Sequence, residues 1–183
     1  MKTISSFNKL LAGFLLFIAL LILFRIIYSG TLRFIFMSWN IFLAWIPYIL
    51  SEYFSQYRNK EKWKQVFLFA SWLFFPNALY IVTDLIHLQD DSNMPDWYDA
   101  VLLFASSFIG IVMAFISLHR AELYLKTIFK SRQVSFIVAG IIFIGSFGVY
   151  LGRFQRWNSW DVVNNPLELG IDIYSKIINS FDN

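Results

Sequence analysis

The sequence contains no cysteine and few charged residues, and both shortages narrow what the chain can be. Without cysteine there are no disulfides, no thiolate metal ligands and no cysteine nucleophile. Charged residues make up 15% of the 183 residues, against roughly 25% in soluble domains. Hydrophobic residues reach 58%, more than a soluble core of this size can bury. The composition therefore predicts an integral membrane protein.

The motifs of common enzyme classes are also missing. There is no P-loop, no G-x-S-x-G, no H-E-x-x-H and no dinucleotide fingerprint. We expect no cofactor and no nucleic-acid partner. The two histidines, His87 and His119, flank one predicted span and so lie about 30 Å apart. They cannot share a metal ion, and no metal site is predicted.

Five apolar runs come close to the roughly 20 residues that a helix needs to cross a bilayer. They cover about residues 10–24, 32–53, 66–82, 98–118 and 134–151. No small-x-small cleavage site follows the first run, which predicts an uncleaved helix. The predicted fold class is all-α, a polytopic bundle of about five transmembrane helices over residues 1–166.

Residues 167–183 have a different pattern, typical of a short amphipathic helix. Asn165, Pro166 and Glu168 match an N-cap, a first turn and a capping-box acid. Apolar residues then recur at spacings of four and three: Leu167, Ile171, Tyr174, Ile178 and Phe181. We expect this helix to lie on the outer membrane surface or to pack on the bundle.

The charges of the loops predict the orientation. Basic residues crowd the second loop, at 58–64, and the fourth, at 120–132, whereas the third carries aspartates and no basic residue. By the positive-inside rule the N-terminus is cytoplasmic and the C-terminus lies outside. Frequent Phe, Ile, Asn, Tyr and Lys are typical of AT-rich genomes, which favours the plasma membrane of a bacterium.

The outer end of the third span carries two candidate catalytic residues. Asp84 and His87 are three apart and share a face of a continued helix. Such a pair either prepares an imidazole for general base work or is an ordinary interfacial hydrogen bond. Asp96 and Asp99 are interpreted as the N-cap and first turn of the fourth span.

A polar and aromatic segment follows the fifth span, at residues 150–161. Arg153 and Arg156 are either a fork for a phosphate or carboxylate, or the partners of Asp84 and Asp99. We predict that one of the two arginines pairs with Asp84, which otherwise faces the unfavourable end of its own helix dipole. The candidate substrate-binding residues are Arg153, Arg156, Asn158, Asp161 and Asn40.

Small residues mark two helix faces that allow close approach of a second helix. One face carries Ser106, Gly110 and Ala114, and the other carries Gly148 and Gly152. We expect contacts within the chain first, and a homodimer or membrane partner second.

Several segments together resemble a bacterial family called domain of unknown function 1361. They are residues 39–47, 75–78, 83–85, 152–154 and 156–161, and the resemblance covers about residues 25–166. It implies a bacterial multi-span membrane protein and assigns no activity.

Three functional hypotheses stay open. The first is a binding or catalytic site at the outer membrane boundary for an anionic lipid or envelope precursor. The second is a non-enzymatic membrane subunit or scaffold whose polar groups only clamp the helices. The third is a transporter, which the absence of ionisable residues at mid-membrane disfavours. Whether a reaction takes place does not follow from the sequence.

Overall fold

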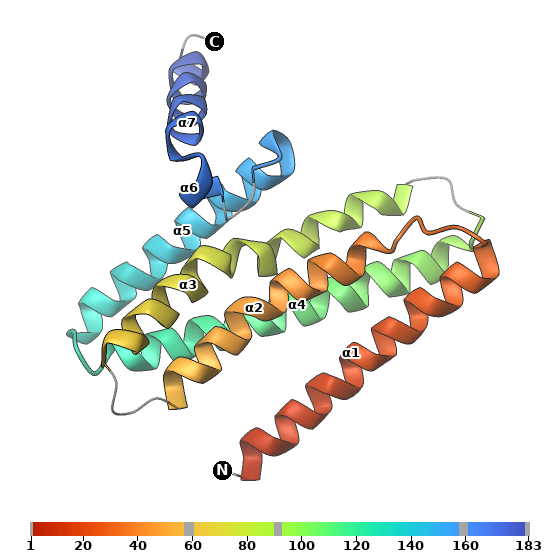
Figure 1. Cartoon of the computed structure of the whole chain (residues 1–183), viewed down its shortest axis with the longest axis horizontal. Helices are drawn as coiled ribbons and strands as arrows, with labels where there is room; N and C mark the ends of the chain where they lie inside the picture. The colour runs from red at the N-terminus through yellow and green to blue at the C-terminus, as the bar shows by residue number, and fades with distance from the viewer. Residues whose placement is uncertain (1, 57–60, 90–92, 158–160, 182–183) are drawn as a thin grey trace.

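The computed structural model describes residues 2–56, 61–89, 93–157 and 161–181, which form helices and no strand. The long helices lie alongside one another (Figure 1): α1 (Lys2–Ser29), α2 (Phe36–Gln56), α3 (Glu61–Tyr80), α4 (Asp96–Leu125) and α5 (Ser131–Gln155). Shorter elements complete the chain: the 3-10 helix η1 (Ile81–Gln89), α6 (Asp161–Asn164) and α7 (Pro166–Phe181). The predicted all-α class is confirmed.

Four helical segments of the described chain are long and apolar enough to cross a membrane: Ser6–Ser29, Gln65–Leu88, Asp96–Leu125 and Ser131–Gln155. The remaining long helix, α2, has 21 residues but includes polar side chains such as Asn40 and Glu52. It nevertheless runs beside α3 and α4 (Figure 1). The molecule is therefore a helical bundle of four to five spans.

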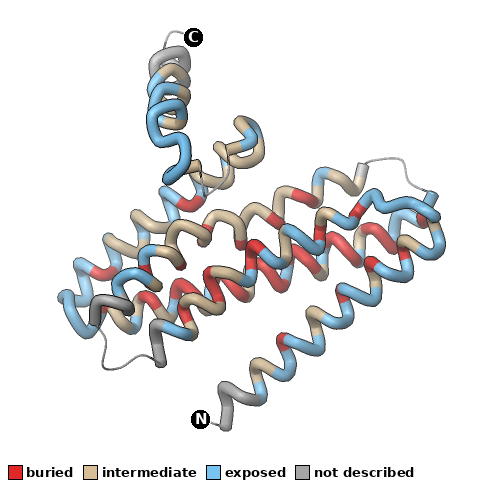
Figure 2. The backbone as a smooth tube through the Cα atoms, viewed as in Figure 1, coloured by how far each residue is buried: buried red, intermediate tan, exposed pale blue. Residues whose placement is uncertain are grey.

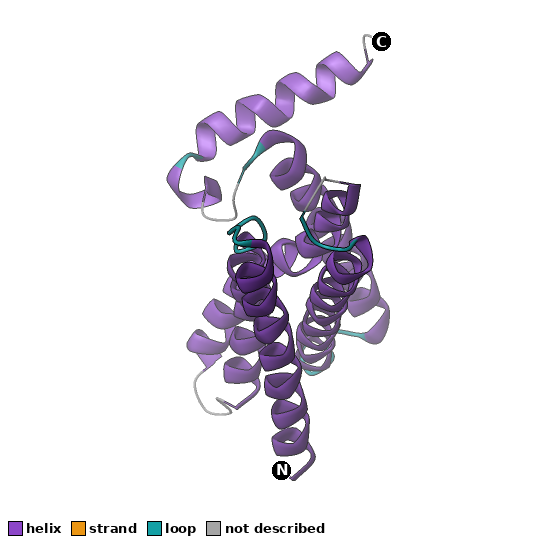
Figure 3. Ribbon diagram, turned by 90° about the vertical axis from the view of Figure 1, so that its right-hand side faces the viewer, coloured by secondary structure: helices purple, strands orange, loops and turns teal. Residues whose placement is uncertain are grey.

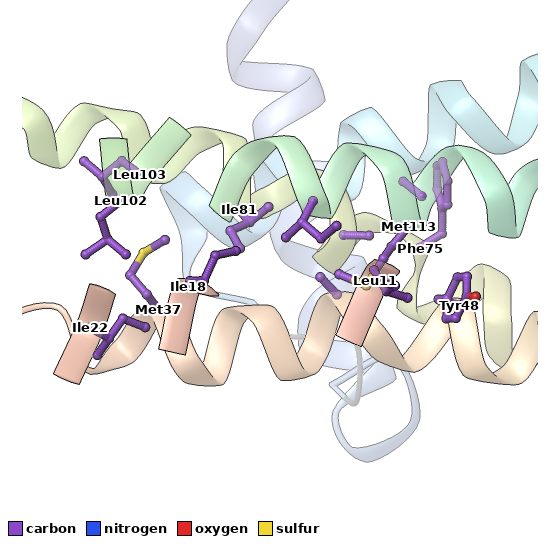
Figure 4. Close-up of a cluster of buried hydrophobic side chains, with 14 of the residues drawn as sticks. Leu11, Ile18, Ile22, Met37, Tyr48, Phe75, Ile81, Leu102, Leu103 and Met113 are labelled. Carbon is purple, nitrogen blue, oxygen red and sulfur yellow. The ribbon is translucent and has the colours of Figure 1, made fainter. Parts of the chain in front are cut away.

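The centre of the bundle is formed by α2, α3, α4 and η1, with α1 packed on α4 and α5 packed on α3. Buried positions concentrate in this centre (Figure 2). Met37, Ile81, Leu102, Leu103 and Met113 form its apolar core (Figure 4). The outer helices expose many large apolar side chains, as helices facing lipid do.

The C-terminal part of the third span is the 3-10 helix η1, which the sequence did not predict. At Gly110 of α4 the two helices meet so closely that a Cβ would collide with Ile81 and the carbonyl oxygen of Ala78. Thr83 Oγ1 donates a hydrogen bond to the Tyr80 carbonyl where the helix type changes. In a 3-10 helix, residues three apart lie directly above one another. The tighter winding decides which side chains of η1 point inward.

The C-terminal helix α7 begins at Pro166, as predicted. It runs across the long axis of the bundle (Figures 1 and 3). Leu167, Ile171 and Tyr174 of the predicted apolar stripe are 67–81% exposed. The side of α7 that faces the bundle carries Leu169 and Ile173 instead. The helix is therefore apolar on two sides, and periodicity identified the side that faces away from the bundle.

Candidate functional site

Asp84 lies in η1 with its carboxylate almost fully buried. Asn40 of α2 donates a hydrogen bond from Nδ2 to Asp84 Oδ2 at 2.6 Å. Arg153 of α5 donates from Nη1 to Asp84 Oδ1 at 3.4 Å. The predicted pairing of Asp84 with one of the two arginines is confirmed, with Arg153 as the partner. The carboxylate thus joins three elements that are distant in sequence.

Arg153 makes a second contact that links the ion pair to α3. The same Nη1 donates to the hydroxyl of Tyr80 at 3.4 Å, and the guanidinium lies 5.9 Å from the Tyr80 ring centroid. The Arg153 side chain is 20% exposed, whereas that of Asp84 is 2% exposed. The arginine end of the pair is therefore reached by solvent or ligand, and the aspartate end is not.

A cavity of about 560 Å³ opens beside this cluster. Its walls come from α2, α3 and α5, and α6 and α7 close one side through Val162, Leu169 and Ile173. The volume lies within the ~300–1,000 Å³ range of small-molecule sites. The lining is mostly apolar and aromatic, including Trp39 and Trp72.

Most polar side chains of the cavity lie toward the Arg156 end. Asn40, Tyr80 and Arg156 line it there, and Asn77 lines it about one helical turn deeper. Trp72 and Ile144 line it further into the bundle. At 1.5 Å per helical residue, Ile144 and Arg156 are about 18 Å apart along α5. The cavity is therefore amphipathic along its length. Its polar end at Arg156 is called the mouth below, and its interior is mostly apolar, with Trp72 Nε1 a buried donor that has no partner among the described residues.

Arg156 ends α5 in a conformation that is rare for its residue type. Its φ is 61°, and it is the one residue other than glycine with a positive φ in the described chain. Glycine or asparagine is preferred at such a helix end. Of the alternatives given above for the two arginines, Arg153 is the partner of Asp84, whereas Arg156 lines the cavity.

The remaining predicted site residues are less closely connected to the cavity. His87 packs edge-on against Phe36, with ring centroids 5.3 Å apart. Asp161 is the first residue of α6, and Asn158 lies outside the described residues. Trp157, in the predicted aromatic segment, lines the cavity and donates from Nε1 to Asp172 Oδ2 of α7 at 2.9 Å. This bond holds α7 to the end of α5.

Both small-residue faces lie against other parts of the same chain. Ser106, Gly110 and Ala114 are buried, with Gly110 against η1. A Cβ at Gly148 would meet Pro76 of α3 at 2.9 Å, and one at Gly152 would meet the Tyr80 ring at 3.4 Å. These glycines, which line the cavity, allow α3 and α5 to approach each other at its wall.

A second buried ion pair joins α1 to α4, and sequence reasoning missed it. Arg25 donates from Nε to Asp99 Oδ1 at 2.8 Å and from Nη2 to Asp99 Oδ2 at 3.1 Å. The Arg25 guanidinium also lies 4.2 Å from the ring centroid of Phe34. Neither Arg153 nor Arg156 is the partner of Asp99 in this pair, contrary to one of the alternatives above. The available signal was a lone arginine directly after the first apolar run, at residues 10–24.

Asp96 does not cap α4 as predicted. The N-cap position is Pro95, and no side chain makes a cap hydrogen bond there. Asp96 and Asp99 both lie in the first turn, but Asp99 points to Arg25. The role of Asp99 therefore depends on the buried Arg25 of α1 as well as on the dipole of α4.

These features define a helical membrane protein with an amphipathic cavity. The chain belongs to the family described as protein of unknown function (DUF1361), whose model matches residues 39–182. The match begins later than the resemblance noted above and extends through α7, so it includes every residue that lines the cavity and leaves out α1. No curated protein and no solved structure matches the chain.

Proposed function

We propose that the protein binds an anionic amphiphile, a membrane lipid or a lipid-linked envelope precursor, in the cavity between α2, α3 and α5. The observation that carries the proposal is the polarity of the cavity, with Arg156 at the mouth and apolar side chains deeper in. A lipid has the same division between a charged head and an apolar chain. The cavity could take up the first part of an acyl or polyprenyl chain, with the head at Arg156.

The conformation of Arg156 supports its assignment as the anion-binding residue. A left-handed backbone costs roughly 1–2 kcal/mol for a residue other than glycine. No described residue forms a hydrogen bond or ion pair with its guanidinium, so structural pairing does not offset that cost. A residue that is strained and lines a cavity is a candidate for function. Its planar guanidinium suits phosphate and carboxylate groups.

Asp84 has a supporting role in this proposal. Its carboxylate is buried and engaged by Asn40 and Arg153, and therefore does not face the ligand as a free base. The pair holds α2 and α5 on either side of the cavity mouth, as the clamp hypothesis requires. Binding and clamping are then properties of neighbouring residues, and no chemical reaction is required.

We propose a bacterial plasma membrane location with the N-terminus in the cytoplasm, which places the cavity mouth at the outer boundary. The basic second and fourth loops support this orientation. The absence of native cysteine makes a direct test simple. In intact cells, a membrane-impermeant maleimide should label the protein with Ser92→Cys and not the protein with Lys62→Cys. The reverse labelling pattern would reject the orientation.

The binding proposal is tested with purified protein in mixed micelles. Arg156→Ala should lower the affinity for phosphatidylglycerol roughly 10-fold or more, because a hydrogen bond to a charged group contributes about 1.5–3 kcal/mol. The matched control is Arg132→Ala, an exposed arginine at the other end of α5, which should leave affinity unchanged. Native mass spectrometry of the retained lipid provides the measurement. Equal losses in both variants would reject a site at Arg156.

A further inference from the structure

The ion pair beside the cavity fixes the orientation of the Asn40 side chain. Both Asp84 oxygens receive donors, Asn40 Nδ2 at 2.6 Å and Arg153 Nη1 at 3.4 Å. An ionised carboxylate accepts hydrogen bonds and donates none. If the Asn40 amide were flipped, its carbonyl oxygen would face a carboxylate oxygen at hydrogen-bond distance and be repelled. Asn40 therefore keeps its NH2 group toward Asp84.

The other half of the amide is available to a ligand. Asn40 lines the cavity, and its Oδ1 has no hydrogen-bond partner among the described residues. The only buried side-chain nitrogen or oxygen without a partner in that part of the chain is Trp72 Nε1. The Asn40 oxygen is therefore not enclosed by protein. It is an open acceptor in the cavity wall.

The opposite kind of group also lines the mouth. Arg156 can only donate hydrogen bonds. The Tyr80 oxygen accepts from Arg153 Nη1 at 3.4 Å, which leaves the phenolic proton free to donate elsewhere. Tyr80 and Arg156 both line the cavity. The mouth thus combines two donors, suited to an anion, with one acceptor, suited to a donor on the same ligand.

We infer that the ligand's headgroup carries a hydroxyl in addition to its anionic group, and that Asn40 accepts a hydrogen bond from this hydroxyl. The inference rests on the proposed function and narrows its ligand class. An ammonium donor is disfavoured, because Arg153 and Arg156 place positive charge at the same mouth. Asp84 acts as a positioning residue, since it determines which end of the Asn40 amide meets the ligand.

Three phospholipids with identical acyl chains separate the inference from the function on which it rests. Phosphatidylmethanol is anionic and has no headgroup hydroxyl, phosphatidylglycerol is anionic and has two, and phosphatidylcholine has no net charge and no donor. The wild-type protein should bind phosphatidylglycerol about 5- to 10-fold more tightly than phosphatidylmethanol, the factor expected for one neutral hydrogen bond. Phosphatidylmethanol should in turn bind more tightly than phosphatidylcholine.

Variants then assign the hydroxyl preference to Asn40. Asn40→Leu should bring the ratio of the phosphatidylglycerol and phosphatidylmethanol affinities to about one, and Asp84→Asn should lower it by freeing the amide to rotate. Arg156→Ala should weaken both anionic lipids and leave the ratio intact. Because each ratio is measured within one variant, a loss of stability does not obscure it.

Two outcomes would overturn the inference in distinguishable ways. Equal affinities for phosphatidylglycerol and phosphatidylmethanol, with phosphatidylcholine weaker, would reject the inferred hydroxyl contact. The proposal that the ligand is anionic would still stand. Equal affinities for all three lipids would also reject the proposed function, which requires a preference for anionic lipids. A hydroxyl preference that survives Asn40→Leu would place the acceptor at another residue and reject the role of Asn40.

Discussion

Among the described residues, the Arg25–Asp99 and Asp84–Arg153 pairs both have a buried carboxylate, and they differ in how completely the protein encloses them. In the Arg25–Asp99 pair both guanidinium contacts are short, and the side chains are 1% and 5% exposed. In the Asp84–Arg153 pair a single nitrogen approaches one carboxylate oxygen at 3.4 Å. The first pair is sealed and bidentate. The second is looser and borders the cavity.

The difference indicates different roles for the two pairs. The Arg25–Asp99 pair attaches α1 to α4 through the buried face that also carries Ile18 and Ile22, and the Tyr98 hydroxyl of α4 donates to the Leu21 carbonyl of α1 nearby. The Asp84–Arg153 pair orients Asn40 and Tyr80 at a cavity mouth. The sealed pair joins two helices, whereas the pair with the accessible arginine also borders the cavity for which we propose a ligand.

The largest expected effect comes from breaking the sealed pair. Asp99→Ala should lower the free energy of unfolding by about 3–5 kcal/mol, because Arg25 is left buried without its carboxylate. Chemical denaturation in detergent, followed by circular dichroism, measures the loss. The matched control is Asp96→Ala, which removes an acid from the same turn of α4 and should cost less than 1 kcal/mol.

The paired substitution distinguishes a lost contact from a stranded charge. Replacing both partners, Arg25→Leu with Asp99→Leu, should recover much of the stability lost in Asp99→Ala. If the double variant is as unstable as the sum of its two single variants, the ion pair is not what attaches α1.

The loose pair should be less costly to break, because Arg153 can turn toward the cavity and water. Asp84→Ala should lower the free energy of unfolding by about 1.5–3 kcal/mol, the range for hydrogen bonds to a charged group. In a double-mutant cycle its effect should be strongly non-additive with Arg153→Ala and additive with Arg156→Ala. The same denaturation assay applies. Non-additivity with Arg156 instead of Arg153 would contradict the pairing seen in the structure.

The sequence predicted one pair and not the other for a physical reason. Asp84 was expected to find a cation because it sits at the unfavourable end of a helix dipole, and topology put Arg153 at the same depth. Arg25 directly follows an apolar run, and nothing in the sequence relates it to Asp99, which was interpreted as a residue of the first turn of the fourth span. Only the packing of α1 on α4 shows that it is buried beside Asp99.

The helices were predicted well because apolar length directly reflects the thickness of a bilayer. The cavity was not predicted, because it depends on how α2 packs beside α3 and α5, which approach each other closely at Gly148 and Pro76. The inward side of α7, with Leu169 and Ile173, was also missed. An apolar stripe shows that a helix has a face to cover, but does not show which face meets the bundle.

The smallest expected effect concerns Arg156, the arginine that borders the loose pair without joining it. Arg156→Gly should raise the free energy of unfolding by about 1 kcal/mol, because glycine adopts the left-handed conformation without the steric cost that arginine bears. The same variant should bind phosphatidylglycerol more weakly. A gain in stability that accompanies a loss of binding is the signature of a residue retained for its ligand and not for the fold.

Lys126→Gly is the matched control for this last prediction. Lys126 also follows the end of a long helix, but its φ is −62°, and Nζ lies 2.7 Å from Glu122 Oε1. Glycine relieves no strain there and removes an ion pair, so Lys126→Gly should lower stability and leave lipid binding unchanged. If Arg156→Gly instead lowers stability as Lys126→Gly does, the arginine contributes to the fold. Arg156 would then resemble the residues of the Arg25–Asp99 pair, in that its main contribution would be to the stability of the fold.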